Sequence, residues 1–127
     1  MKPILHLIRG VPGSGKTTLA NRIVQRAHVC EMDDYWLCED GKIRFDPLQQ
    51  WIAYHKCYAK CRQLMEKNVS EIAVANPFIH RESMAEYREL AERYDYKINE
   101  IICCGRYKNV HDVPESVVEQ MRAEFEV

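Results

Sequence analysis

The stretch RGVPGSGKTTLA, residues 9–20, is the most informative part of the chain. It satisfies the pattern G-x-x-x-x-G-K-[ST], in which a glycine-rich loop turns its backbone amides toward phosphate oxygens at the start of a helix. Lys16 is expected to neutralise the terminal phosphates of ATP, and the Thr17 hydroxyl is expected to ligate Mg²⁺. The predicted nucleotide-binding residues are Gly10, Pro12, Gly13, Ser14, Gly15, Lys16, Thr17 and Thr18.

The segments around this loop alternate between strand and helix patterns. The apolar run at 3–9 leads into the loop, and a helix is expected to follow it. Asp46 and Pro47 form a capping residue and a first-turn proline, which together predict the start of a long helix. Expected strands are 3–9, 29–32, 71–75 and 97–103, and expected helices are 17–26, 46–68, 81–93 and a last one from Pro114. This order predicts an α/β fold with a short parallel sheet and helices on both faces.

The length and composition predict one compact domain over residues 1–127. The formal charge is -1, so the overall balance does not demand a nucleic-acid partner. No signal peptide or membrane-length run is expected, and the six cysteines are expected to be reduced thiols of a cytoplasmic protein. Cys57 and Cys61, with His55 nearby, raise the alternative of a metal site. Core packing is favoured because paired zinc knuckles are missing, so no structural zinc is expected.

Asp33 and Asp34 follow the second expected strand directly. Residues just past the carboxyl ends of neighbouring parallel strands converge on the phosphate site, where a carboxylate can take a proton from an acceptor hydroxyl. An acidic turn or helix cap is the alternative explanation. The third strand ends in Val74-Ala75-Asn76 and lacks the acidic partner that Mg²⁺ usually has there. Either Asp33 or Asp34 holds the ion through water, or Thr17, phosphates and waters hold it alone.

A basic segment, CGRYKNVHDVP at 104–114, lies between the last strand and the last helix. A transferring enzyme needs cations near the departing phosphate and cover against water. Arg106, Lys108 and His111, which follow the glycine at 105, are therefore candidates for a lid. A solvated basic loop is the alternative.

Together these motifs resemble a small P-loop kinase family that includes the 5′-kinase domain of phage polynucleotide kinase and the ATP-binding domains related to Nedd4-binding protein 2. The resemblance rests on GVPGSGKTT, on Asp33-Asp34-Tyr35, on Asn76 and Arg81, and on N-x-H-x-V-P at 109–114. It implies a P-loop NTPase three-layer sandwich that is adenylate-kinase-like. It also implies that Asp33 is the general base for a 5′-hydroxyl and that Lys108, or Arg106 beside it, contacts the donor phosphates.

The chain also departs from this family pattern. The phage kinases have an arginine after the D-D-Y turn that holds a phosphate of the acceptor, and Trp36 stands there in this chain. An aromatic side chain can stack on a base instead. The leading hypothesis is transfer of the γ-phosphate of ATP to a nucleic-acid or nucleotide 5′-hydroxyl. The alternatives are a small-molecule kinase and a nucleotide-binding module with little or no turnover.

Overall fold

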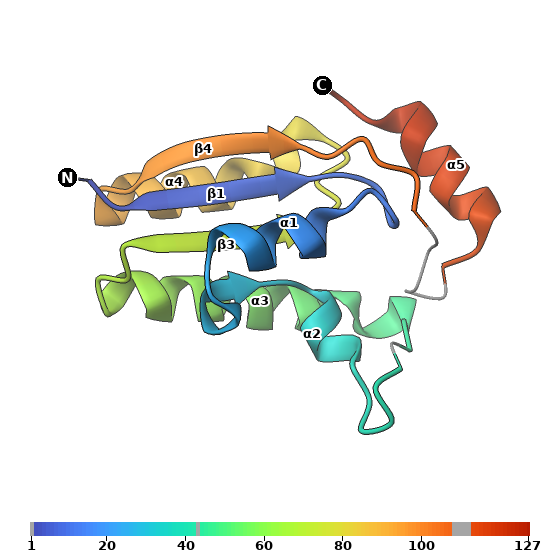
Figure 1. Ribbon diagram of the computed structural model, residues 1–127, viewed down its shortest axis with the longest axis horizontal. Coiled ribbons are helices and arrows are strands. Elements are labelled where there is room, and N and C mark those ends of the chain that lie inside the picture. Colours follow the sequence, from blue (N-terminus) through green and yellow to red (C-terminus); the bar gives the residue numbers. More distant parts are fainter. Residues whose placement is uncertain (1, 43, 108–112) are drawn as a thin grey trace.

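A four-stranded parallel sheet in the order β2-β3-β1-β4 forms the centre of the protein (Figure 1). The computed structural model describes residues 2–42, 44–107 and 113–127. The strands are β1 (Ile4–Arg9), β2 (Val29–Cys30), β3 (Glu71–Asn76) and β4 (Lys97–Ile102). β1 pairs in parallel with β3 from Ile4↔Glu71 to Arg9↔Asn76, so the carboxyl ends of these two strands lie level.

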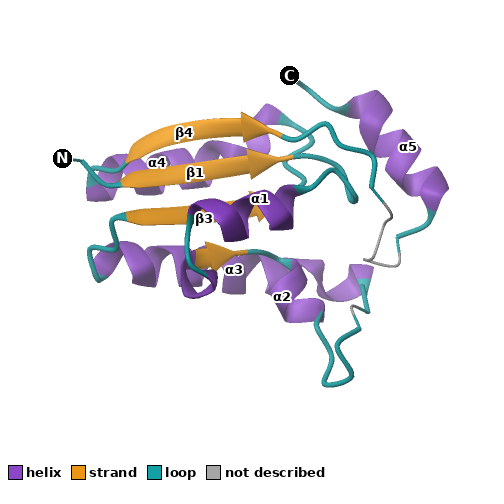
Figure 2. Cartoon of the chain, viewed as in Figure 1, coloured by secondary structure: helices purple, strands orange, loops and turns teal. Residues whose placement is uncertain are grey.

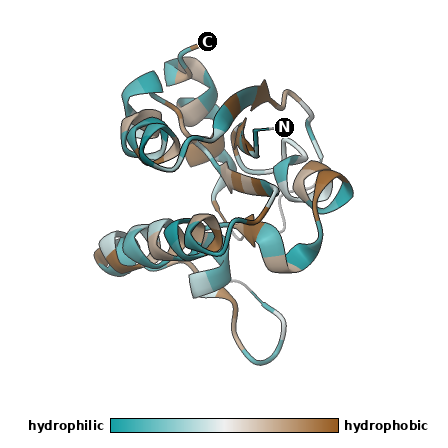
Figure 3. Cartoon of the chain, turned by 90° about the vertical axis from the view of Figure 1, so that its left-hand side faces the viewer, coloured by the Kyte–Doolittle hydropathy of each residue, from teal (hydrophilic) through white to brown (hydrophobic). Residues whose placement is uncertain are grey.

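Helices cover both faces of the sheet, as Figure 3 shows in a view with the apolar strands between them. The α-helices are α1 (Lys16–Ile23), α2 (Asp33–Trp36), α3 (Gln50–Glu66), α4 (Ala85–Tyr94) and α5 (Glu115–Glu124). Short 3₁₀ turns occupy Arg26–His28, Pro47–Gln49 and Arg81–Met84. The predicted α/β class with a parallel sheet and helices on both faces is therefore confirmed.

Side chains of β1 point alternately to the two faces of the sheet, and each face has its own apolar core. Leu5 and Leu7 point to one face and pack in a buried cluster with residues of α3 and α4. Ile8 points to the other face and packs with Ala20 of α1. Cys57 and Cys61 lie fully inside the first of these cores, which confirms their prediction as core residues. All six cysteines are free thiols.

The observed elements differ from the predicted ones at the start of the long helix and directly after β2. Asp46 accepts a hydrogen bond from the amide of Leu48 at 3.0 Å, as the capping prediction requires, but the first turn after it is 3₁₀. The segment after β2 is a short helix, α2, and not a turn. Trp51, at the start of α3, is 65% exposed, whereas Cys57 further along the same helix is buried. Among the described residues no helix is long and apolar enough to span a membrane.

Candidate phosphate-binding and acceptor site

The glycine-rich loop leaves the carboxyl end of β1 and enters α1, the position that the motif predicts (Figure 2). The amide of Gly10 donates to the carbonyl oxygen of Pro77 at 3.1 Å, which fastens the loop to the end of β3. A Cβ atom at Gly10 would lie 2.3 Å from Ser14 Oγ and 2.8 Å from the carbonyl oxygen of Cys103. Since no side chain fits there, the glycine is a steric requirement for the tight start of the loop.

The segment after β4 borders the same loop. The amide of Gly105 donates to the carbonyl oxygen of Ser14 at 3.2 Å, and the amide of Tyr107 donates to that of Gly13 at 2.8 Å. Gly15 has φ of 98°, and its missing Cβ leaves room for the Tyr107 ring, whose edge would be 3.2 Å away. Arg106 stands between these two anchored residues and is exposed. Of the expected lid residues, Lys108 and His111 lie outside the described part of the chain.

Lys16 is buried in the loop, with only 6% of its surface exposed. Its ammonium donates to the carbonyl oxygen of Val11 at 3.2 Å. Burial lowers the pKa of this lysine, while the negative charges of Asp33 and then Glu31 act in the opposite direction. The ammonium is therefore desolvated and has two carboxylates near it, an environment in which an incoming phosphate would strengthen its charged form.

The buried hydroxyl of Ser14 indicates whether the loop fits a phosphate. Ser14 is 4% exposed, and among the described residues its Oγ has no hydrogen-bond partner. A buried hydroxyl without a partner costs free energy, commonly about 1–3 kcal/mol, unless a ligand satisfies it. Pro12 is buried beside it, whereas Thr18 is exposed on the first turn of α1. The loop residues therefore fit the phosphates of ATP.

Glu31 is a site residue that the sequence reasoning missed. It follows β2 directly, is 6% exposed, and accepts a hydrogen bond from Thr17 Oγ1 at 2.5 Å. Arg26 Nη1 donates to its other carboxylate oxygen at 3.0 Å. Carboxylate and hydroxyl oxygens are the ligands that Mg²⁺ prefers, so Thr17 and Glu31 together fit this ion. In the sequence, the only indication of this role is that an acidic residue directly follows the apolar pair Val29-Cys30.

The two aspartates of α2 lie in different environments. Asp33 supplies the largest opposing electrostatic effect on Lys16, so the structure brings these two predicted residues together. Asp34 instead forms an ion pair with Arg26 Nη2 at 2.5 Å and lies 4.0 Å from Lys60 Nζ. Asp34 is therefore held by Arg26, whereas the charge of Asp33 acts on Lys16.

Asn76 occupies the strand end where a metal-binding carboxylate is usual. It is 4% exposed, and its Oδ1 accepts from the amide of Met32 at 2.9 Å. Its Nδ2 donates to the sulfur of Cys57 at 3.5 Å. Since Met32 directly precedes α2, this amide side chain fixes the place where Asp33 begins the helix.

Trp36 is buried, so the base stacking that an aromatic residue at this position could provide lacks an exposed ring. It is 5% exposed, with ring centroids 5.0 Å from Tyr35 and 5.2 Å from Phe45. The loop that carries Phe45 folds back over it, and the amide of Arg44 donates to its carbonyl oxygen at 3.1 Å. Its ring is part of a local aromatic core and offers no free face. Arg81, the other residue matched by resemblance, lies 3.6 Å from Glu100 of β4.

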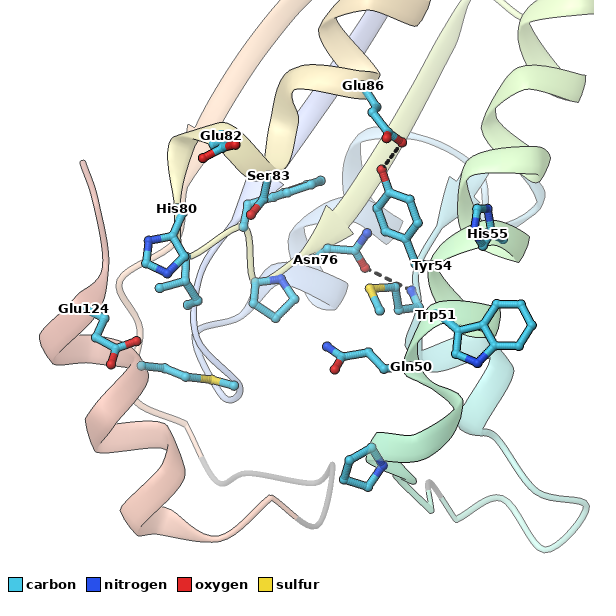
Figure 4. A pocket seen from close by; sticks show the side chains of 16 residues that line it. Gln50, Trp51, Tyr54, His55, Asn76, His80, Glu82, Ser83, Glu86 and Glu124 are labelled. Atoms are coloured by element: carbon cyan, nitrogen blue, oxygen red, sulfur yellow. Dashed lines mark hydrogen bonds between the residues drawn. The ribbon is translucent and has the colours of Figure 1, made fainter.

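A cavity of about 880 Å³ lies beside the phosphate loop, between α3, the end of β3 and α5 (Figure 4). Asn76, Pro77 and Met32 form the part of its wall that also contacts the loop or begins α2. The buried Arg9 supports the opposite side, since it donates to the carbonyl oxygen of Phe78 at 3.1 Å and lies over the ring of Phe125, 4.7 Å from its centroid. The chamber therefore borders the start of α2 through Met32, the residue directly before Asp33.

The fold and this loop define the class of P-loop proteins with a kinase-like sheet. Residues 5–127 match the family described as AAA domain, and the chain belongs to that family. Over 98 residues the chain is 29% identical to human NEDD4-binding protein 2; this stretch is 75% of the chain but only 6% of that protein. The expected relationship to small P-loop kinases and to Nedd4-binding protein 2 domains is therefore confirmed.

Two solved structures share the fold at low sequence identity. A proposed kinase from Chloroflexus aurantiacus superposes with a TM-score of 0.63 at 18% identity, over 80% of this chain and 59% of that one. A chain of the Pnkp1/Rnl/Hen1 complex superposes with a TM-score of 0.62 at 20% identity, over 94% of this chain and 38% of that one. These likenesses support the P-loop NTPase sandwich, and the chain spans only part of each of these proteins.

Proposed function

We propose that the protein transfers the γ-phosphate of ATP to a hydroxyl group of an acceptor. Lys16 and the amides of residues 13–17 would bind the β- and γ-phosphates, and the buried Ser14 hydroxyl would gain a partner. Thr17 and Glu31 would hold Mg²⁺, directly or through water. Bound there, the ion would neutralise charge on the phosphates as the terminal bond breaks.

Asp33 is the proposed general base. The observation that carries the proposal is the combination of this carboxylate near Lys16 with a cavity of about 880 Å³ at the same strand ends. A hydrolase has to position only a water molecule, whereas a kinase must admit an acceptor and take the proton of its hydroxyl. A chamber of this size, lined by the residue directly before this carboxylate, favours the second task.

Arg106 and Lys108 are the proposed cations for the transferring phosphoryl group. Support for Arg106 comes from its neighbours, because Gly105 and Tyr107 are hydrogen-bonded to the carbonyl oxygens of Ser14 and Gly13. These bonds hold the backbone of Arg106 at the rim of the phosphate loop. Lys108 remains a proposal from the family resemblance.

Two acceptor classes are candidates. The Asp33-Asp34-Tyr35 motif, through its resemblance to polynucleotide kinases, favours a nucleic-acid or nucleotide 5′-hydroxyl. The buried Trp36 favours a small molecule, since the position that carries a phosphate-binding arginine in the phage enzymes here offers neither a cation nor a stacking surface. The cavity is large enough for a small molecule of several rings.

Incubation with labelled ATP and Mg²⁺ and a panel of hydroxyl acceptors tests the proposal. Asp33→Asn is expected to bind ATP normally and to lose transfer by about 10²- to 10⁴-fold, the usual contribution of a general base. Asp34→Asn is the matched control, because this carboxylate pairs with Arg26. Undiminished transfer in Asp33→Asn would remove the base assignment. ATP binding without transfer to any acceptor would favour a nucleotide-binding module.

A further inference from the structure

The cavity that Met32 and Asn76 line carries charges that disfavour a phosphorylated acceptor. Its described lining includes three carboxylates, Glu82, Glu86 and Glu124, and no lysine or arginine. The carboxylates come from three separate elements, the turn Arg81–Met84, α4 and α5, and Figure 4 shows them around the chamber. A polyanion entering here would meet like charges, and a cation would meet opposite ones.

The nearby arginines do not reverse this charge. Arg81 lies 3.6 Å from Glu100, and Arg122 of α5 hydrogen-bonds to Glu119 and lies 3.5 Å from Glu115. Among the described residues, these two arginines are therefore paired with acids outside the cavity lining. Two histidines, His55 and His80, also line the chamber, and His80 Nδ1 lies 3.2 Å from a carboxylate oxygen of Glu126.

Aromatic side chains line the same chamber. Tyr54 and Trp51 come from α3, and Phe78 lies at the end of β3. The Tyr54 hydroxyl donates to Glu86, so an aromatic ring and a carboxylate are held next to each other, as the dashed line in Figure 4 shows. Rings together with carboxylates are the combination that binds organic cations, through the ring faces and through charge.

We propose that the acceptor is a small hydroxyl-bearing molecule with a positive charge, such as an amino alcohol or an aminosugar, and that it binds in this cavity. The inference rests on the proposed function, since it names the acceptor of the same transfer. The amine lies toward Glu82, Glu86 and Glu124, and the hydroxyl points toward Met32 and Asn76, beside Asp33. The γ-phosphorus–oxygen bond to ADP breaks as the acceptor oxygen bonds to phosphorus, and the hydroxyl proton passes to Asp33.

Calorimetric titration of the full chain tests the inference with three probes. Kanamycin is a polyamine built from three rings, maltotriose is its neutral counterpart in size, and a 5′-hydroxyl tetranucleotide is the anionic probe. At physiological salt, which screens distant charges, kanamycin is expected to bind at least about tenfold more tightly than maltotriose. The double variant Glu82→Gln/Glu124→Gln should remove most of this difference. Glu89→Gln, an exposed position of α4 outside the cavity lining, should keep it.

Three results would overturn the inference. They are kanamycin binding no tighter than maltotriose, the tetranucleotide binding tightest, and Glu89→Gln losing as much affinity as the double variant. Transfer assays with the same probes separate this inference from the proposed function. Transfer to the tetranucleotide in preference to kanamycin would overturn the inference and leave the phosphotransferase proposal standing, whereas failure to bind ATP would overturn both.

Discussion

The phosphate loop and the neighbouring cavity share one edge of the sheet, but the chain builds them in different ways. The loop is a single segment, residues 10–15, in which contacts such as Gly10 against Ser14 and Cys103 leave no room for other side chains. The cavity is lined by residues spread from Met32 to Glu124, most of them on the surfaces of helices. The first region therefore has little tolerance for substitution, and the second can change its charge without changing the fold.

Replacement of Lys16 tests the rigid side of this comparison and has the largest expected effect after that of Asp33. Lys16→Met should lower phosphate transfer by about 10²- to 10³-fold, since a preorganised positive donor next to the departing phosphate is lost. The free energy of unfolding should not fall, because burial already disfavours the charged ammonium at this place. Lys67→Met, at an exposed position after α3, is the control. Transfer assays and urea unfolding measure the two effects, and equal transfer by both variants would contradict the assignment.

Glu31→Gln is expected to have the next largest effect. The amide still accepts a hydrogen bond from Thr17 but carries no charge for Mg²⁺, so half-maximal transfer should need several times more Mg²⁺. Titration of Mg²⁺ at fixed ATP measures this shift. Asp34→Asn is the matched control, because Asp34 shares Arg26 with Glu31, whereas the Thr17 hydroxyl donates to Glu31. An unchanged Mg²⁺ requirement in Glu31→Gln would show that Thr17 and the phosphates suffice.

The contrast between Glu31 and Lys16 also shows what the sequence could reveal. The motif identified Lys16 and Thr17 because their geometry is local, and alternating strands and helices predicted the parallel sheet. Glu31 meets Thr17 only because the ends of β2 and β1 converge across β3, a tertiary event. The burial of Trp36 depends likewise on Phe45, nine positions further along. The acidic cavity is lined by residues that lie far apart in the sequence, so no local sequence pattern predicts it.

Asn76→Ala tests the contact between the end of β3 and the start of α2, and it should lower the free energy of unfolding. The amide of Met32 would lose its acceptor inside the protein, which commonly costs about 1–3 kcal/mol of unfolding free energy. Because Met32 precedes Asp33, transfer should also fall while ATP binding changes little. Asn21→Ala, at an exposed position of α1, should change stability by no more than about 0.5 kcal/mol. Chemical denaturation compares them, and similar midpoints would mean that Asn76 does not hold α2 in place.

The smallest expected effect is on tryptophan fluorescence. Trp36 reports on the buried aromatic contacts of α2, and Trp51 reports on the cavity. In Trp36→Phe the remaining emitter is Trp51, which is 65% exposed and lines the cavity, so acrylamide should quench it steeply. In Trp51→Phe the remaining emitter is Trp36, at 5% exposure, and the quenching slope should be several times shallower. A cavity ligand should change only the Trp51 emission, because Trp36 has no free face for it. If a nucleic-acid probe instead quenched Trp36, the aromatic core around it would have to open on binding, and the acceptor side would be less fixed at α2 than its contacts with Tyr35 and Phe45 indicate.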